Sequence, residues 1–224
     1  MTKILLETVN LKKSFAHRNG AIELFNNVNL KVRRGDLIAL VGPSGSGKSS
    51  FLHLLALLDY PTKGKIVLND KDTIDLKDEQ KDQIRRERIS IIFQDNNLLS
   101  DFTTLENVIM PLIIRGEKFT SAIAKANKIL KEVKIFNRMN HFPSEMSGGE
   151  QQRIAIARAL VAETDLILAD EPTGNLDYKT SEDIFSYFLK LKKLNKAIIF
   201  ATHNRELANK ADYKLSIFKG NIKR

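Results

Sequence analysis

A ten-residue stretch rich in glycine and serine, VGPSGSGKSS at residues 41–50, constrains the fold of this chain more than any other feature. It directly follows the apolar run LIAL and leads straight into FLHLLALL, which has the pattern of a helix. A flexible linker seldom lies between a buried strand and a helix. Glycines let a backbone turn its N–H groups inward and approach an anion without a Cβ in the way. The stretch therefore predicts a strand–loop–helix unit whose loop wraps a bound anion.

The loop matches the pattern G-x-x-x-x-G-K-[ST], the P-loop that binds nucleoside triphosphates. The helix that we expect to begin near Ser49 would aim the positive end of its dipole at the phosphates. Lys48 would add a point charge for the β- and γ-phosphates, and the Ser49 hydroxyl would bind Mg²⁺. A glycine-rich turn with an incidental lysine is the alternative, and the flanking elements disfavour it. The expected ATP-binding residues of the loop are Gly42, Pro43, Ser44, Gly45, Ser46, Gly47, Lys48, Ser49 and Ser50.

Four short apolar runs have the pattern of buried parallel strands, and helical patterns separate them, which predicts an α/β fold. The runs are LIALV at 37–41, ISIIF at 89–93, LILA at 166–169 and AIIFAT at 197–202. The first run leads into the glycine loop, and the other three are followed by Gln94, by Asp170 and Glu171, and by His203. Ligands of open parallel sheets bind at the carboxyl ends of the strands. We therefore expect these polar residues to share one site.

The acidic pair that follows the third run has the placement of a Walker B motif. Asp170 would hold Mg²⁺ through water, and Glu171 would polarise the attacking water as a general base. A positioned base of this kind contributes roughly 10²–10⁴ to a rate. The alternative is a pair of carboxylates that only caps a helix, which the P-loop in the same chain disfavours.

Two further regions differ from this pattern. The stretch up to about Val32 alternates apolar and polar residues as antiparallel strands do, with HRNG at 17–20 as a turn. Between Asn96 and His141 the chain has a helical pattern, bracketed by Pro111 and Pro143, which predicts a small helical lobe inserted into the α/β core. Residues expected on one buried helix face in this lobe are Phe119, Ala122, Ala126, Ile129 and Val133.

Composition excludes several classes of protein. The 224 residues contain no cysteine, which excludes a disulfide scaffold and thiolate metal sites. The formal net charge of +9 could indicate nucleic acid or an anionic membrane face. The lysines are spread over helical patterns, so we expect solvated helix faces and no nucleic acid. No stretch reaches the roughly 18 apolar residues of a membrane span, so membrane work would need a separate partner.

The stretch MSGGEQQR at residues 146–153 precedes an apolar-periodic helix pattern. Ser147 and Glu150 have the spacing of a capping box, which accounts for these two residues. It does not account for Gly148 and Gly149, because glycines weaken a first helical turn unless the backbone must approach something closely. A second phosphate-facing helix N-terminus would explain all four residues.

The order of these motifs resembles the ATP-binding cassette ATPases over essentially the whole chain. The P-loop, Gln94, SGGEQQR, LILADEP, GNLD and His203 occur in the order of that family, and SGGE is specific to it among P-loop proteins. Three segments are most similar to the ATP-binding subunits of lipoprotein-releasing transporters: LLSDFTTLENVIMPL (98–112), ADEPTGNLD (169–177) and FLHLLALLDYPTKGKI (51–66). Cassettes of macrolide efflux and of cell division are close relatives.

The resemblance implies roles for residues that the motifs alone leave open. Phe15 takes the position of the aromatic residue that stacks on adenine, where the family usually has tyrosine. Gln94 would bind Mg²⁺ and sense the γ-phosphate, and His203 would contact the γ-phosphate. Asp177 would bridge two subunits. The signature residues Ser147, Gly148, Gly149 and Glu150 would act on the ATP of the other subunit.

The resemblance also implies an organisation. One ATP-binding domain would span residues 1–224, with an α/β core at about 1–93 and 160–224 and a helical lobe at about 95–160 that carries the signature. Two copies would form a homodimer around two ATP molecules. Separate integral membrane subunits would contact the lobe and the region after Gln94 at the cytoplasmic face of the inner membrane, with lipoprotein as the cargo.

Three other functions are open at this point. A related efflux or cell-division cassette shares nearly every motif. A soluble, non-transport cassette protein would have a long coiled coil or two cassettes in one chain, and neither pattern occurs here. A small-molecule P-loop kinase would lack SGGE.

Overall fold

The structure is a computed structural model that describes residues 3–17, 20–174 and 176–224. Its centre is a six-stranded sheet in the order β10-β9-β3-β8-β7-β6. The strands are β3 (Leu37–Val41), β6 (Ile89–Ile92), β7 (Leu166–Asp170), β8 (Ala197–Ala201), β9 (Tyr213–Phe218) and β10 (Asn221–Lys223). The four predicted strands pair in parallel, as does β9 with β3, whereas β10 pairs with β9 antiparallel.

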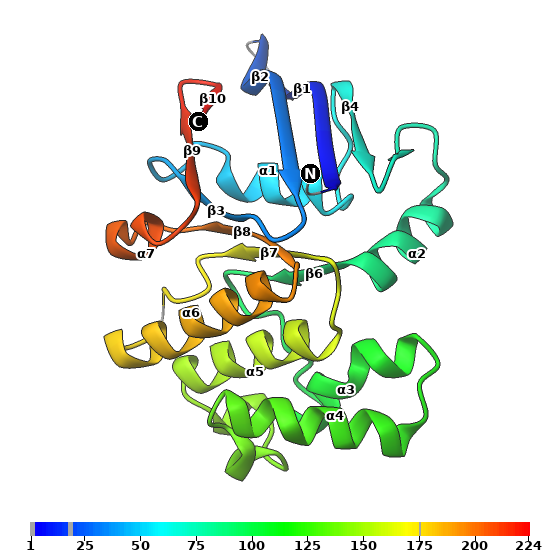
Figure 1. The fold of residues 1–224 in the computed structure, drawn as a ribbon, viewed down its shortest axis with the longest axis vertical. Helices are drawn as coiled ribbons and strands as arrows, with labels where there is room; N and C mark the ends of the chain where they lie inside the picture. Colours follow the sequence, from blue (N-terminus) through cyan, green and yellow to red (C-terminus); the bar gives the residue numbers. More distant parts are fainter. Residues whose placement is uncertain (1–2, 18–19, 175) are drawn as a thin grey trace.

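The central strands β3 and β8 are apolar throughout because both of their faces are covered. Leu37 and Ala39 of β3 face a core shared with the helices on one side, whereas Ile38 and Leu40 face a second core on the other side. Figure 1 shows α1 (Lys48–Leu55) above the sheet and α5 (Gly148–Val161) and α6 (Tyr178–Lys193) below it. The first helix begins at Lys48, next to the predicted Ser49.

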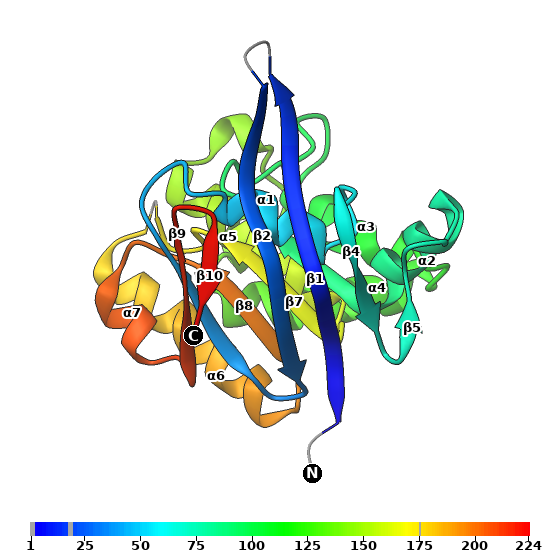
Figure 2. The ribbon, with the colours of Figure 1, turned by 90° about the horizontal axis from the view of Figure 1, so that it is seen from above.

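A second sheet covers the α1 side of the molecule. Its order is β2-β1-β4-β5, formed by β1 (Ile4–His17), β2 (Gly20–Arg33), β4 (Lys63–Leu68) and β5 (Lys71–Asp72). Figure 2 shows the long β1 and β2 strands crossing over the central sheet. The predicted antiparallel strands are confirmed, while the centre of the predicted HRNG turn, residues 18–19, lies outside the described residues.

The helices between β6 and β7 form the group at the bottom of Figure 1. They are α3 (Thr104–Ile114), α4 (Phe119–Glu132), the short 3₁₀ turns Phe136–Arg138 and Pro143–Glu145, and α5. The remaining helices are α2 (Asp78–Arg88) before β6 and α7 (Arg205–Asn209) after β8. No helix in the described part of the chain is long and apolar enough to cross a membrane.

Two details of the helical prediction were wrong. Pro111 does not bound the lobe but lies inside α3, where its ring nitrogen has no N–H to donate to the preceding turn. Phe119 is the first residue of α4 and is 58% exposed. Ala122, Ala126 and Val133 are buried as predicted, and Ile129 is partly buried against the same core.

Candidate active site

A cleft of about 320 Å³ lies where the parallel strands end and α1 begins. It brings together predicted residues from five separate segments of the chain. Leu24 also lines the cleft and was not predicted, because a leucine in an alternating strand gives no sign of a ligand. The lining residues are Phe15, Leu24, Ser44, Gly45, Gly47, Lys48, Ser49, Ser50, Gln94, Asp170, Glu171 and His203.

The loop between β3 and α1 needs its glycines for two different reasons. Gly45 and Gly47 have φ of 74° and 97°, a left-handed conformation that side chains rarely adopt. Gly42 has no such φ, but a Cβ there would lie 2.6 Å from the Ile217 carbonyl oxygen. The loop is therefore shaped by its own backbone conformation and by close packing against β9.

Lys48 is only 7% exposed, and its ammonium group folds back onto its own loop. Lys48 Nζ donates to the carbonyl oxygens of Gly42 (2.9 Å) and Pro43 (3.1 Å), and it lies 3.4 Å from His203 Nε2. These partners are neutral carbonyls and a histidine ring. The positive charge of Lys48 is therefore free to meet an anionic ligand in the cleft.

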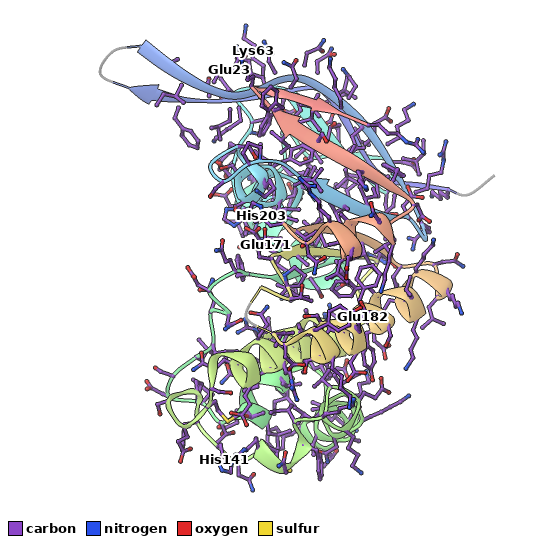
Figure 3. All side chains as sticks on the ribbon, turned by 90° about the vertical axis from the view of Figure 1, so that its left-hand side faces the viewer. Glu23, Lys63, His141, Glu171, Glu182 and His203 are labelled. Atoms are coloured by element: carbon purple, nitrogen blue, oxygen red, sulfur yellow. The ribbon has the colours of Figure 1, made fainter. Side chains whose placement is uncertain are left out.

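Glu171 and His203 face each other across the ends of β7 and β8, as Figure 3 shows. The backbone N–H of His203 donates to Glu171 Oε2 (3.3 Å). Oε1 lies 3.3 Å from His203 Nε2 and accepts no hydrogen bond from the described part of the chain. Burial raises the pKa of the Glu171 carboxyl, and the charges of His203 and Lys48 oppose that shift. A buried carboxylate with a free oxygen and a raised pKa is suited to accept a proton.

The backbone supports this position of Glu171. The residue has a φ of 46°, and its N–H donates to the Ala201 carbonyl at the end of β8 (3.1 Å). Left-handed backbone at a residue other than glycine is uncommon and concentrates at functional sites. The conformation turns the chain so that Asp170 ends β7 and the next side chain reaches the cleft.

The cleft also contains several oxygen atoms that could serve as metal ligands. The Ser49 hydroxyl, the Gln94 amide and the Asp170 carboxylate all line it. Hard cations such as Mg²⁺ prefer oxygen ligands and usually keep several waters beside one or two carboxylates. In the described residues no three His, Cys, Asp or Glu side chains cluster as a metal site. The residues present therefore fit Mg²⁺ shared with phosphate oxygens better than a metal held by protein alone.

Three predicted loop residues do not line the cleft. The carbonyl oxygens of Gly42 and Pro43 accept hydrogen bonds from the ammonium group of Lys48. The Ser46 hydroxyl is buried and has no hydrogen-bond partner among the described residues.

The signature residues lie outside the cleft, at the N-terminus of α5. The predicted capping box is present: Ser147 Oγ accepts from the Glu150 N–H (3.3 Å), and Glu150 Oε2 accepts from the Ser147 N–H (2.9 Å). The hydrogen bonds from Ser147 lower the pKa of the Glu150 carboxyl. Among the residues that the structure describes, a Cβ built on Gly148 would meet no atom of another segment within 4 Å, so their packing does not require glycine there.

Asp177 also lies outside the cleft, where it caps α6. Its carboxylate accepts from the Thr180 N–H (2.9 Å) and the Thr180 hydroxyl (2.6 Å), which lowers its pKa. The exposed carboxylate leaves this end of α6 facing solvent.

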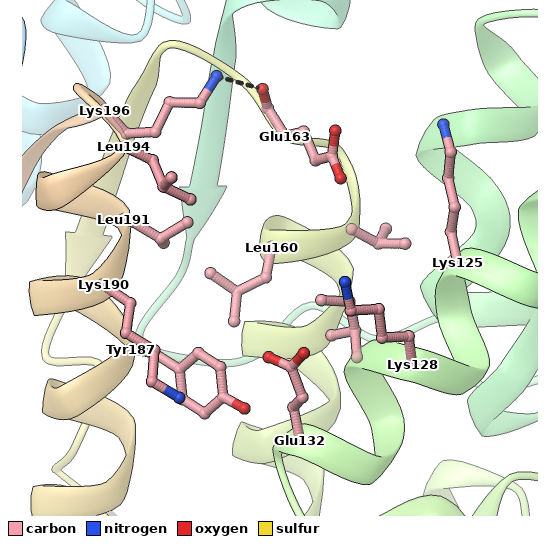
Figure 4. Close-up of a pocket in the computed structure, with 12 residues that line it drawn as sticks. Lys125, Lys128, Glu132, Leu160, Glu163, Tyr187, Lys190, Leu191, Leu194 and Lys196 are labelled. Carbon is pink, nitrogen blue, oxygen red and sulfur yellow. Dashed lines mark hydrogen bonds between the residues drawn. The ribbon is translucent and has the colours of Figure 1, made fainter.

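A larger cavity of about 520 Å³, drawn in Figure 4, contains none of the predicted site residues. It lies between α4 and the carboxyl-terminal ends of α5 and α6, with Leu160, Tyr187 and Leu191 among its apolar lining. The candidate active site is therefore not the larger of these two cavities. It is identified by the charged and polar residues that line the smaller cleft.

Comparison with known proteins agrees with this geometry. A model of the family described as "ABC transporter" matches residues 25–174. The chain belongs to the ABC transporter family. The solved dimer of the bacterial ABC transporter cassette MJ0796 superposes on this cassette with a TM-score of 0.94 and 36% identity, covering 98% of this chain and 97% of the other. A post-hydrolysis structure of the same cassette, bound to ADP and Pi, superposes equally well.

Curated relatives match this cassette over nearly its whole length. The lipoprotein-releasing system ATP-binding protein LolD of Legionella pneumophila (strain Paris) is 42% identical and covers 99% of this chain and 98% of its own length. LolD of Rickettsia bellii is 44% identical with 96% of each chain covered, and LolD of Colwellia psychrerythraea is 42% identical, covering 100% and 86%. The predicted family, fold and ATPase class are thus confirmed.

Proposed function

We propose that this ABC cassette hydrolyses ATP to drive the release of lipoproteins from a membrane. Relatives that are similar along nearly the whole chain carry that function in their names. The observation that carries the proposal is the convergence of Lys48, Asp170, Glu171 and His203 in one cleft at the strand ends. This set provides charge, metal ligands and a base for phosphoryl chemistry.

Each residue has a task in the proposed reaction. Bound Mg²⁺, held by Ser49, Asp170 and Gln94, would neutralise charge on the β- and γ-phosphates. Lys48 leaves the carbonyls of its own loop and binds the same phosphates. Glu171 takes a proton from the attacking water through its free Oε1. His203 contacts Glu171 and Lys48, which supports a role in which it would contact the γ-phosphate.

The signature and Asp177 act across a homodimer in this proposal. Both lie at exposed helix N-termini outside their own cleft, and within the described residues no atom of another segment lies within 4 Å of a Cβ built on Gly148. A helix N-terminus with that space open suits a phosphate held by another copy. The solved dimer of a similar cassette supports such a pairing. Each ATP would then lie between the P-loop of one copy and Ser147–Glu150 of the other.

The membrane subunits would dock in a groove that starts at the region after Gln94. This groove, of about 390 Å³, is lined by Phe93 and Asn97 and by Met110, Pro111 and Ile114 of α3. Its apolar floor lies beside several arginines, and Ile114 is 57% exposed. An exposed apolar surface with a polar rim is typical of a protein interface. Docking there would hold the cassette at the cytoplasmic face of the inner membrane.

Copurification tests this function. The tagged chain, extracted with detergent from membranes, should retain integral membrane proteins, and the assembly should release a labelled lipoprotein from vesicles when ATP is added. Ile114→Asp should abolish copurification, whereas Leu194→Asp, at a 68% exposed leucine of the other cavity, should not. A native chain that retains no membrane protein would contradict the proposal.

A further inference from the structure

The segment that carries Gln94 has an unusual backbone. After β6 ends at Ile92, residues 93–97 form a tight turn, here named the Gln94 turn, in which the Asn96 N–H donates to the Phe93 carbonyl (3.2 Å). Asn96 and Asn97 have φ of 56° and 46°, so two consecutive residues other than glycine are left-handed. Such a conformation persists only when the surroundings hold it.

Arg158, which lies on α5, holds this turn in its conformation. Its guanidinium donates to the carbonyl oxygens of Asn96 (2.6 Å) and Asn97 (2.7 Å). Burial holds the pKa of this guanidinium below its ordinary value, and no carboxylate in the described ranges offsets that cost. The planar fork of an arginine fits two adjacent acceptors in a way that a lysine cannot. A half-buried arginine used only for two backbone carbonyls indicates that the turn needs to be held.

Arg158 also connects three parts of the proposed machinery. It lies on α5, the helix that begins with the signature residues, and α5 packs against α3 and β6. Arg158 and Asn97 both line the groove beside α3. Gln94, in the same turn, lines the ATP cleft. One side chain therefore joins the signature helix, the groove and the turn that presents Gln94 to the cleft.

We propose that Arg158 is a positioning residue that holds the Gln94 turn in its left-handed form and makes it move together with α5. Gln94 then reaches the cleft only when the Gln94 turn and α5 keep the relative position that these two hydrogen bonds fix. Occupation of the groove would thus be transmitted to the cleft through these two hydrogen bonds. The inference rests on the proposed function and adds a residue that touches neither ATP nor metal.

The test compares Arg158→Met with Arg34→Met. Methionine keeps apolar bulk and removes the donors. Arg34 is a suitable control because its guanidinium also makes several hydrogen bonds, two to Asp165 (2.9 and 3.2 Å) and one to Asn69 (3.3 Å). Arg34 lies shortly before β3 and Asp165 directly before β7, so both lie at the ends of these strands opposite the cleft. Arg158→Met should leave the KM for ATP within about twofold and lower kcat about tenfold or more, since small misplacements at a catalytic group are costly. Arg34→Met should change neither constant. Arg158→Lys, which reaches one carbonyl, should have an intermediate kcat.

Amide hydrogen exchange gives a readout that does not depend on hydrolysis. Exchange of the Gln94 turn in the nucleotide-free protein should be about tenfold or more faster in Arg158→Met than in the native chain or in Arg34→Met. Native kcat and native exchange in Arg158→Met would overturn the inference. A native chain that neither binds nor hydrolyses ATP would instead refute the proposed function, and the exchange measurement would still report whether Arg158 holds the turn.

Discussion

Replacing Glu171 with glutamine isolates the general base from the rest of the cleft. Glutamine has nearly the same shape, so its side-chain oxygen can still accept from the His203 N–H, but it cannot take a proton from water. Loss of a positioned base lowers kcat by roughly 10²–10⁴, which is roughly 2.7–5.5 kcal/mol of activation free energy. ATP binding should persist because Lys48 and the loop are untouched. With Mg²⁺ and ATP, the variant should accumulate as a dimer of two 25.4 kDa chains.

The same variant should also differ from the native chain in its free energy of unfolding. Because burial raises the pKa of Glu171, the charged carboxylate destabilises the fold at neutral pH, and protonation removes that cost. Glu171→Gln should therefore have a higher free energy of unfolding than the native chain at pH 7. The difference should shrink as the pH falls toward about 4.3, the ordinary pKa of a glutamate.

Phosphate release and urea denaturation measure the two effects. Glu182→Gln is a suitable control because Glu182 lies on α6, apart from Glu171 in Figure 3, and pairs with the exposed Lys210. The control should hydrolyse ATP at the native rate. If Glu171→Gln also hydrolysed ATP at the native rate, Glu171 would not be the base.

Three further predictions concern the aromatic platform, the P-loop and the signature. Phe15→Ala should weaken ATP and GTP alike by roughly 1–3 kcal/mol in calorimetry, because the exposed ring, with Lys13 Nζ 4.7 Å from its centroid, stacks on any base; affinities within twofold of native would exclude that role. Gly42→Ala should lower the free energy of unfolding by roughly 1–3 kcal/mol, because its Cβ would lie 2.6 Å from a backbone carbonyl. Gly148→Ala, whose Cβ meets no atom, should not destabilise the fold yet should reduce hydrolysis; full activity would show that no ligand approaches Gly148.

The parallel strands that the sequence predicted share one property. Strands such as β3 and β8 are buried on both faces, so their residues are continuously apolar and stand out from their surroundings. Their polar followers could be assigned to one site because parallel strands end at the same edge. The P-loop added the strongest constraint, since a strand, an eight-residue pattern with four specified positions, and a helix occur in succession.

The parts that were missed have weaker patterns. In β4, the sequence KGKIVL contains two lysines and a glycine, and that glycine is needed because β4 approaches β1 closely, with a Cβ position 2.3 Å from the Asn10 carbonyl. The short strand β10 is mostly exposed, so its sequence has no apolar run from which a strand could be predicted. The misplaced Phe119 shows that helical spacing does not tell where a helix leaves the core. Arg158 gave no signal, because its partners are backbone carbonyls 61 and 62 positions away along the chain.

The account's central claim is that each ATP site is built from two copies of this chain. Ser147→Arg should place a bulky cation at the N-terminus of α5 and block closure of the dimer, while ATP still binds the P-loop of the same chain. Lys48→Ala should lose tight ATP binding, because it removes a charge-assisted contact in a largely buried site. Each variant alone should be inactive.

Mixing the two variants tests the claim most directly. In a mixed dimer, the native P-loop of the Ser147→Arg chain meets the native signature of the Lys48→Ala chain, so one of the two composite sites is intact. ATP hydrolysis, measured as phosphate release against mixing ratio, should therefore recover in part and be highest near equal amounts. No recovery at any ratio, with both variants folded, would contradict a shared site.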